Sequence, residues 1–194
     1  MNDTTEEAIE EEVAEAAQAV REGEVAPAPM TLATDEIDLP TLGRLLVSSG
    51  FYKDTTSIAQ AAIRVLAGKE LGLGPIASMQ NIYVVRGRLS LAYPLMAALI
   101  KQSKRHDYKI KELNDTRCEL EFFSKRDDES PWESDGVSTF DMADAKRAGL
   151  LVPGGGWQKY PRNMLFARAL SNGARFHCPD VFAGAIYEKG EMEA

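Results

Sequence analysis

The chain has 194 residues, of which 44% are hydrophobic, and a formal net charge of −8. These values suit one soluble globular domain with a tail. The longest apolar runs, such as residues 95–100, are far too short to span a bilayer. The acidic N-terminus lacks the basic and apolar segments of a secretion signal. Two cysteines, Cys118 and Cys178, are too few for a disulfide framework and are expected to be small buried side chains. We therefore expect a cytoplasmic protein.

Charge is distributed unevenly along the chain. Residues 1–30 hold nine acidic side chains and one arginine, so this segment alone has a net charge of −8. Its Glu- and Ala-rich composition and a Pro-containing end predict an acidic disordered arm and linker over residues 1–38. Residues 39–187 hold 20 Lys/Arg and 15 Asp/Glu, a net charge of +5, and are predicted to form one domain, followed by a short tail at 188–194. A basic body with an acidic arm suits a polyanion binder, although acidic tails also serve solubility alone.

The first part of the domain is predicted to begin with two helices. Apolar spacing predicts a helix over residues 39–47 and a second that ends at Gly72, because glycine favours the left-handed backbone of a helix stop. Asp54 or Thr55 is the candidate cap of the second helix. The apolar face of this helix is expected to contain Ile58, Ala62 and Leu66, with Ala59 and Ile63 beside them.

The middle of the domain is predicted to contain most of the strands. Two short strands, 82–85 and 89–92, meet at an Arg86-Gly87 turn, and a helix over 95–102 follows. Alternating apolar side chains then predict a small antiparallel sheet. Its strands are expected to contain Tyr108 and Ile110, then Cys118, Leu120 and Phe122, then residues 137–140, with turns at Asn114-Asp115 and a loop at 127–135.

The C-terminal part is predicted to be helical. A short helix over 142–148 has Asp141 as its cap, glycines 154–156 form a flexible joint, and a helix runs from Pro161 to about Asn172. Strands cluster instead of alternating with helices, so the fold class is α+β. We expect a β-hairpin plus a small antiparallel sheet packed with about five helices.

Motifs for nucleotide or metal chemistry are incomplete. The segment 72–77 (GLGPIA) loosely matches a dinucleotide motif, but a helix precedes it and Pro75 removes a backbone donor. The segment around Lys69 lacks both the first glycine and the Ser or Thr that a phosphate loop requires. His106 and His177 have no partners at zinc-ligand spacing. We expect no cofactor, no metal, no catalytic residue and no enzymatic activity.

The main enzymatic alternative is a Mg²⁺-dependent nuclease that uses Glu119 and Glu121. Carboxylates on one face of a strand can hold Mg²⁺ for phosphodiester cleavage, with Lys125 nearby. The structural interpretation is that both glutamates lie on the outward face of an amphipathic strand. On that interpretation Arg117 and Lys111 pair with them.

The segment from Trp157 to Arg175 places four cations close in sequence to Trp157 and Tyr160. Cations neutralise phosphates and rings offer stacking platforms, as in proteins that bind single strands without sequence preference. The structural alternative, with no role in binding, is a solvated amphipathic helix. Arg168 and Arg175 nearly eclipse on a helix while Arg162 lies on another side, so several elements are expected to line one groove. The candidate DNA-binding residues are Arg86, Arg88, Lys101, Arg105, Trp157, Lys159, Tyr160, Arg162, Arg168 and Arg175.

Four segments resemble phage recombination proteins of the RecT/Redβ type: 67–75 (AGKELGLGP), 82–91 (IYVVRGRLSL), 159–170 (KYPRNMLFARAL) and 178–182 (CPDVF). The resemblance covers residues 39–187. It implies an ATP-independent single-strand annealing protein in a bacterial host cell. Such proteins coat single-stranded DNA, form rings or helical filaments, pair the strand with its complement and act beside a phage exonuclease. The longer C-terminal tail of such proteins is not part of the resemblance, so its partner contacts are not carried over.

The expected mechanism uses no fuel. A groove lined by the 159–175 helix and the 82–92 hairpin grips the backbone, and Trp157 or Tyr160 stacks on bases. Base pairing and ion release then supply the free energy of annealing. Besides annealing and the nuclease alternative, a non-catalytic scaffold that contacts only proteins is the third class.

Overall fold

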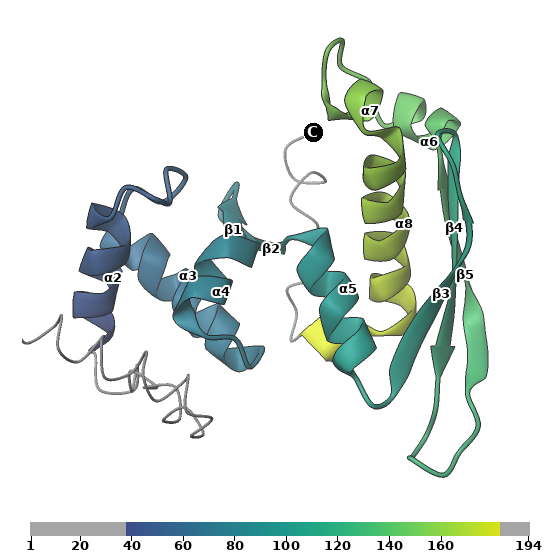
Figure 1. Ribbon diagram of the computed structural model, residues 1–194, viewed down its shortest axis with the longest axis horizontal. Coiled ribbons are helices and arrows are strands. Elements are labelled where there is room, and N and C mark those ends of the chain that lie inside the picture. Colours follow the sequence, from purple (N-terminus) through teal and green to yellow (C-terminus); the bar gives the residue numbers. More distant parts are fainter. Residues whose placement is uncertain (1–37, 183–194) are drawn as a thin grey trace, which may run out of the picture. The chain divides into compact units, whose positions relative to one another are not determined.

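The computed structural model describes residues 38–182, which contain seven α-helices, one 3₁₀-helix and two antiparallel sheets (Figure 1). The α+β class is therefore confirmed, with two more helices than the expected five. The chain divides into two units, residues 1–41 and 42–194, and the elements discussed below belong to the second unit apart from the first turn of α2. The described part of the chain contains no candidate for a membrane-spanning helix.

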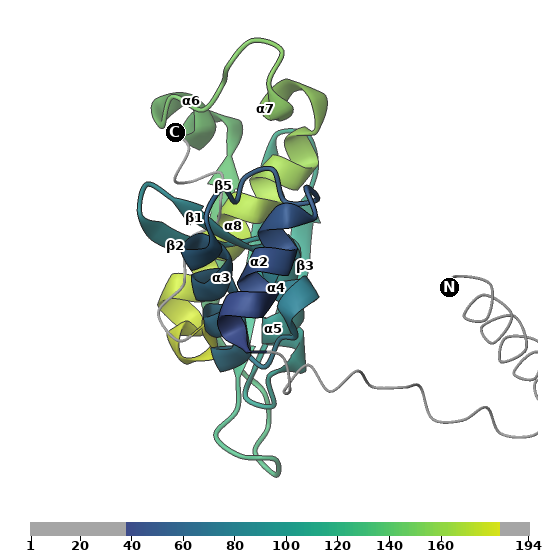
Figure 2. The ribbon, with the colours of Figure 1, turned by 90° about the vertical axis from the view of Figure 1, so that its left-hand side faces the viewer.

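Figures 1 and 2 label most of the helices and strands, which follow one another along the chain in a fixed order. They are α2 (Leu39–Ser48), α3 (Ile58–Glu70), α4 (Pro75–Asn81), β1 (Ile82–Val85), β2 (Arg88–Leu91), α5 (Tyr93–Gln102), β3 (His106–Leu113), β4 (Arg117–Ser124), β5 (Glu133–Asp141), α6 (Met142–Arg147), α7 (Gly156–Lys159), α8 (Pro161–His177) and the 3₁₀-helix η2 (Pro179–Phe182). The predictions for residues 1–37 and 188–194 lie outside the described residues.

Helix α3 begins later than the sequence predicts. Ser57 is its N-cap, and the Ser57 side-chain oxygen accepts a hydrogen bond from the Gln60 N–H at 3.1 Å. The prediction that Asp54 or Thr55 caps this helix is therefore wrong. Both residues contact Arg64 instead, which draws them away from the helix end. An exposed serine closer to the first turn takes over the cap because it offers the same acceptor.

The buried face of α3 also differs from the prediction. Ile58, Ile63 and Leu66 are 41%, 51% and 47% exposed. The buried residues of the helix are Ala61, Arg64, Val65 and Gly68. Helix α4 selects this face, because a Cβ added at Gly68 would overlap the Ser78 side chain and only a small residue allows the approach. Apolar spacing alone does not identify which face meets a partner.

The predicted stop at Gly72 is confirmed. Gly72 has a φ of +74°, which glycine adopts without a Cβ clash. The Gly72 N–H donates to the Lys69 carbonyl at 3.0 Å, and the Leu73 N–H donates to the Gly68 carbonyl at 2.8 Å. This pair of bonds is a Schellman motif, which satisfies carbonyls that the helix end leaves open.

The hairpin β1–β2 is confirmed with its predicted turn. Val85 pairs with Arg88, and Arg86 and Gly87 between them have φ values of +50° and +76°. Two consecutive positive values define the type I′ turn that suits the twist of a hairpin. Helix α4 before it has no counterpart in the sequence prediction. Pro75 is its first residue, where the missing N–H costs no helical hydrogen bond.

The three-stranded sheet has the order β3-β4-β5, so the strand predicted over 137–140 is its third strand and is longer than expected. Helix α8 packs across β4 and β5, and α5 packs against β3 and α8 (Figure 1). The approach of α8 is closest at Gly173, where an added Cβ would overlap the Phe122 ring and lie 2.9 Å from the Ser138 Cβ. Helix α8 runs five residues past the predicted end at Asn172.

The inward face of the sheet is largely as predicted. Tyr108, Cys118, Leu120 and Phe122 are buried, whereas Ile110 is exposed. The pairing register shifts after Ile110, and all residues from position 109 to the end of β3 are exposed, so no helix covers that end of the strand. Burial raises the pKa of the Cys118 thiol to about 12, and burial does the same for Cys178. Both cysteines are therefore neutral buried side chains, as expected.

The segment between the sheet and α8 combines a confirmed cap with an unexpected helix. Asp141 caps α6 in a capping box, since its side chain accepts from the Asp144 N–H at 2.8 Å and the Asp144 side chain accepts from the Asp141 N–H at 3.2 Å. Helix α7 begins at Gly156, the third of the glycines at 154–156, where the sequence predicts only a joint. It carries Trp157 and Lys159 toward the start of α8.

Candidate nucleic-acid interface

The arginines of α8 are positioned by the way this helix packs. Arg168 and Arg175 lie seven residues apart, on the same side of the helix, and both are half-buried. The Arg175 guanidinium donates to the Asn172 side-chain oxygen at 2.5 Å. Arg162 lies on another side, where its Nε is 2.8 Å from Asp115 Oδ1 in the β3–β4 turn. The three arginines therefore do not form one stripe, and a groove that joins them stays a prediction.

Trp157 is a core residue and not an exposed stacking platform. Its side chain is only 6% exposed, and its ring centroid lies 6.0 Å from that of Phe140. The suggestion that Trp157 stacks on bases is therefore wrong, because a large indole next to the sheet gains more from burial. Tyr160 precedes α8 and is 62% exposed, so it remains a candidate for stacking on bases. Lys159 is exposed at the end of α7.

The hairpin tip presents its cations to solvent. Arg86 occupies the turn and Arg88 begins β2, and both side chains are exposed. The type I′ turn fixes the backbone here, so the direction in which Arg86 leaves the hairpin is set by the fold. The predicted position of both residues at the hairpin turn agrees with the structure.

The two candidates after α5 differ in their surroundings. Lys101 Nζ contacts Asp107 Oδ1, donates to the Tyr108 carbonyl at 2.6 Å and lies 4.5 Å from the Tyr108 ring centroid. The protein itself therefore neutralises Lys101. Arg105 is exposed and lines a pocket of about 420 Å³. The other lining residues are His106, Ser124, Lys125, Arg126, Ser130, Pro131 and Glu133.

Two cations of that pocket are absent from the predicted set. Lys125 Nζ lies 3.1 Å from Asp128 Oδ1 and 5.3 Å from the Trp132 ring centroid, so it has an internal partner. Arg126 forms no ion pair with any residue of 38–182. Both follow β4 directly and precede three acidic residues at 127–129, a sequence that resembles an ordinary solvated loop. Only the folded structure places them beside Arg105.

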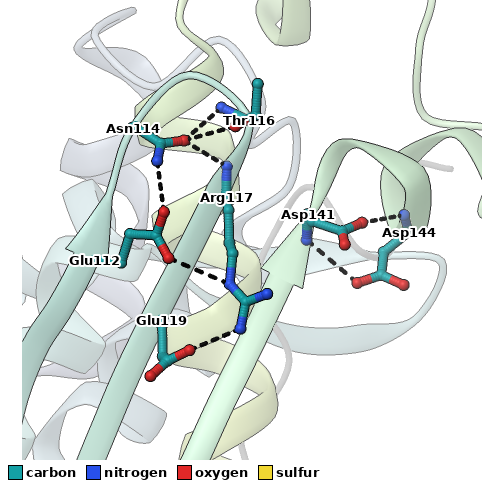
Figure 3. Close-up of polar contacts among 7 residues, drawn as sticks. All are labelled: Glu112, Asn114, Thr116, Arg117, Glu119, Asp141 and Asp144. Atoms are coloured by element: carbon teal, nitrogen blue, oxygen red, sulfur yellow. Dashed lines mark hydrogen bonds and ion pairs between the residues drawn. The ribbon is translucent and has the colours of Figure 1, made fainter.

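Glu119 and Glu121 lie on the outward face of β4 and are held by neighbouring cations. Figure 3 shows Arg117 between Glu112 and Glu119, with the Nη2–Oε2 distance to Glu119 at 2.7 Å and the Nε–Oε2 distance to Glu112 at 3.4 Å. Lys111 Nζ lies 3.0 Å from Glu121 Oε2. The predicted pairing with Arg117 and Lys111 is thus confirmed.

The charge state of these glutamates follows from their partners. The hydrogen bond from Lys111, and then the one from Ser134, lower the pKa of Glu121 below its usual range. A Mg²⁺ ion at this face would have to displace both Arg117 and Lys111 from their carboxylates. Within residues 38–182, no group of three or more His, Cys, Asp or Glu side chains is placed to hold a metal ion.

Carboxylates and cations are balanced very differently across the described surface. Outside residues 125–135, every described carboxylate except that of Glu70 has a hydrogen-bond or ion-pair partner within the described residues. Outside the same range, nine cations form no side-chain hydrogen bond or ion pair with any described residue, and together with Arg126 we call them the unpaired cations. They are Arg44, Lys53, Lys69, Arg86, Lys104, Arg105, Lys109, Arg126, Lys146 and Lys159. Positive charge is therefore in excess on the described part of the chain outside residues 125–135.

Comparison with known proteins adds no family to this picture. A scan against protein-family models and a search of curated proteins both find no match to the chain.

Proposed function

We propose that this chain is an ATP-independent protein that binds single-stranded DNA and anneals complementary strands, of the RecT/Redβ type. The observation that carries the proposal is the excess of unpaired cations over unpaired carboxylates outside residues 125–135. Such a surface attracts a polyanion, and each phosphate that it neutralises releases condensed counterions.

The proposed binding is blind to sequence. The unpaired cations come from several elements, among them α2, α3, the hairpin tip, the segment after α5, and the helices α6 and α7, so a bound strand would meet them from more than one element. Contacts to phosphates position a strand without reading its bases. The bases then remain open to a complementary strand, and base pairing together with ion release supplies the free energy. In rings or helical filaments of this chain, consecutive subunits would hold consecutive stretches of one strand.

The proposed setting is phage-type homologous recombination. An annealing protein needs single strands, and a phage exonuclease that resects duplex ends is the expected supplier. This partner and the bacterial cytoplasm as location both derive from the family resemblance. The unpaired cations support only the binding of a polyanion, so the exonuclease calls for its own test by co-purification.

Salt dependence tests the proposed contacts. Arg86→Gln and Lys159→Gln should each weaken the binding of all sequences equally and should each flatten the slope of log Kobs against log salt by about 0.7, because each removes one phosphate contact. Fluorescence anisotropy with labelled oligo-dT and a mixed-sequence strand measures both effects. The matched control is Lys111→Gln, since Lys111 is already paired with Glu121 on the outward face of the sheet. Slopes that match the control for both variants would remove these residues from the interface.

A further inference from the structure

We propose that a pocket beside the hairpin, lined by Phe51, Tyr52 and Tyr83, holds one unpaired nucleobase of the bound strand. This inference rests on the proposed function, since it assumes that a single strand reaches this surface. It assigns a site to the bases, whereas the cations discussed above account only for the phosphates. These three rings take the base-stacking role that the sequence suggests for Trp157.

The pocket has a volume of about 350 Å³ and is formed by three segments of the chain. The loop before α3 provides one wall, and helix α3, helix α4 and strand β1 provide the rest; the lining residues are Phe51, Tyr52, Asp54, Arg64, Met79, Gln80 and Tyr83. Phe51 is 87% exposed, although an isolated Phe gains free energy by burial. A ring that the fold leaves open beside two other rings has the composition of a stacking site.

Arg64 links the segments that line the pocket. It is only 2% exposed, and its Nη1 lies 3.0 Å from Asp54 Oδ2. It also contacts Thr55 Oγ1 and the Met79 carbonyl, so it ties the loop to α4. Its guanidinium carbon lies 5.3 Å from the Tyr83 ring centroid, which fixes the third wall. These contacts fix the walls that Asp54, Met79 and Tyr83 provide, so a ligand does not have to order that part of the pocket.

Arg64 also leaves one hydrogen-bond donor unused. Its Nε is buried and has no hydrogen-bond partner among the residues that the structure describes. Buried polar groups are nearly always satisfied, so this donor is an exception, but the atom is too enclosed for a ligand in the pocket to reach it. The Gln80 side chain is exposed, and its amide offers both a donor and an acceptor to a base edge.

The surroundings favour a nucleotide over an apolar side chain of a partner protein. Lys53 follows Tyr52 directly in the chain, is exposed and is one of the unpaired cations. Arg86 is three residues from Tyr83 on the same hairpin and is another. A base between these rings would thus have cations near the phosphates on either side of it. A purely apolar ligand would cover the exposed Gln80 amide without offering it a hydrogen bond.

The test compares a natural strand with an abasic strand of equal length and phosphate number. Phe51→Ala should weaken the binding of oligo-dT roughly tenfold, as expected for the loss of one stacked base. It should leave the binding of the tetrahydrofuran abasic strand unchanged, and its salt slope should equal that of the wild type. Phe51→Tyr keeps the ring and should retain the wild-type affinity. Phe51 is exposed, so its replacement leaves the core intact, and circular dichroism verifies this.

The matched control is Phe176→Ala, which removes an exposed ring on α8 outside the pocket and should keep the difference between the two strands. If Phe51→Ala binds oligo-dT like the wild type, or loses the same factor on the abasic strand, the base pocket is wrong while DNA binding stands. A loss of self-association in sedimentation without DNA, with equal effects on both strands, would make Phe51 a protein contact and also overturn the pocket. If the wild type binds neither strand at low salt, the proposed function fails as well.

Discussion

Gly173→Ala should lower the free energy of unfolding by about 3 kcal/mol, near the upper end of typical overpacking effects. A Cβ at this position overlaps the Phe122 ring and comes within 2.9 Å of Ser138. The Phe122 ring has no room to retreat, because it is fully buried and stacks on His177 with a centroid distance of 5.1 Å. Helix α8 would have to move off the sheet. Urea denaturation followed by circular dichroism measures the change.

The control for this effect is Gly156→Ala in α7. The nearest atom to its added Cβ is Met164 Sδ at 3.5 Å, which is an ordinary contact. We expect a change within about 0.5 kcal/mol, as for surface substitutions. If Gly173→Ala were as stable as this control, the close packing of α8 on β4 and β5 would be wrong. The positions of Arg168 and Arg175, which α8 sets, would then be wrong too.

Deletion of residues 1–30 should tighten the binding of single-stranded DNA by roughly tenfold at low salt, because it removes a net charge of −8 that repels phosphate. The gain should vanish near 1 M salt, where the Debye length falls to about 3 Å. Anisotropy titrations of the full chain and of residues 31–194 over a salt series measure the difference.

A charge-neutralised arm separates charge from bulk in this experiment. In this variant the nine acidic residues of the arm are replaced by their amides, so the length of the arm is kept. It should bind like the deletion variant if the charge competes with phosphate. Equal affinity of all three proteins at low salt would leave the arm with a role in solubility alone.

Local chemistry explains which parts of the fold could be predicted from the sequence. The Arg86-Gly87 turn, the Gly72 stop and the Asp141 cap each depend on a few neighbouring residues, and the structure confirms all three. The outward pairing of Glu121 with Lys111 also follows from strand alternation. These features need no knowledge of which elements pack together.

Features that depend on tertiary partners could not be predicted in this way. The buried face of α3 is chosen by α4, which meets it at Gly68, and apolar spacing carries no information about that contact. Trp157 is likewise buried by Phe140, a residue far from it in the chain. Its position beside cations in the sequence therefore gave a misleading stacking candidate.

The candidate base pocket also depends on tertiary packing, so it could not be predicted from the sequence. Phe51 and Tyr52 are adjacent aromatics, which was an available signal, but Tyr83 lies on a strand more than thirty residues later. Only the fold brings the three rings to one pocket. In the sequence, nothing distinguishes Arg64 from an ordinary helical arginine. Single cations and rings are visible in a sequence, whereas their assembly into a site is not.

The most direct test of the account is strand annealing without nucleotide or metal. One labelled strand is coated with the full chain in the presence of EDTA, its labelled complement is then added, and duplex formation is followed by energy transfer. The account predicts that duplex forms much faster than without protein, and that substitution of Arg86 and Lys159 together slows it. Annealing at the protein-free rate, by a chain that nevertheless coats the first strand, would contradict it.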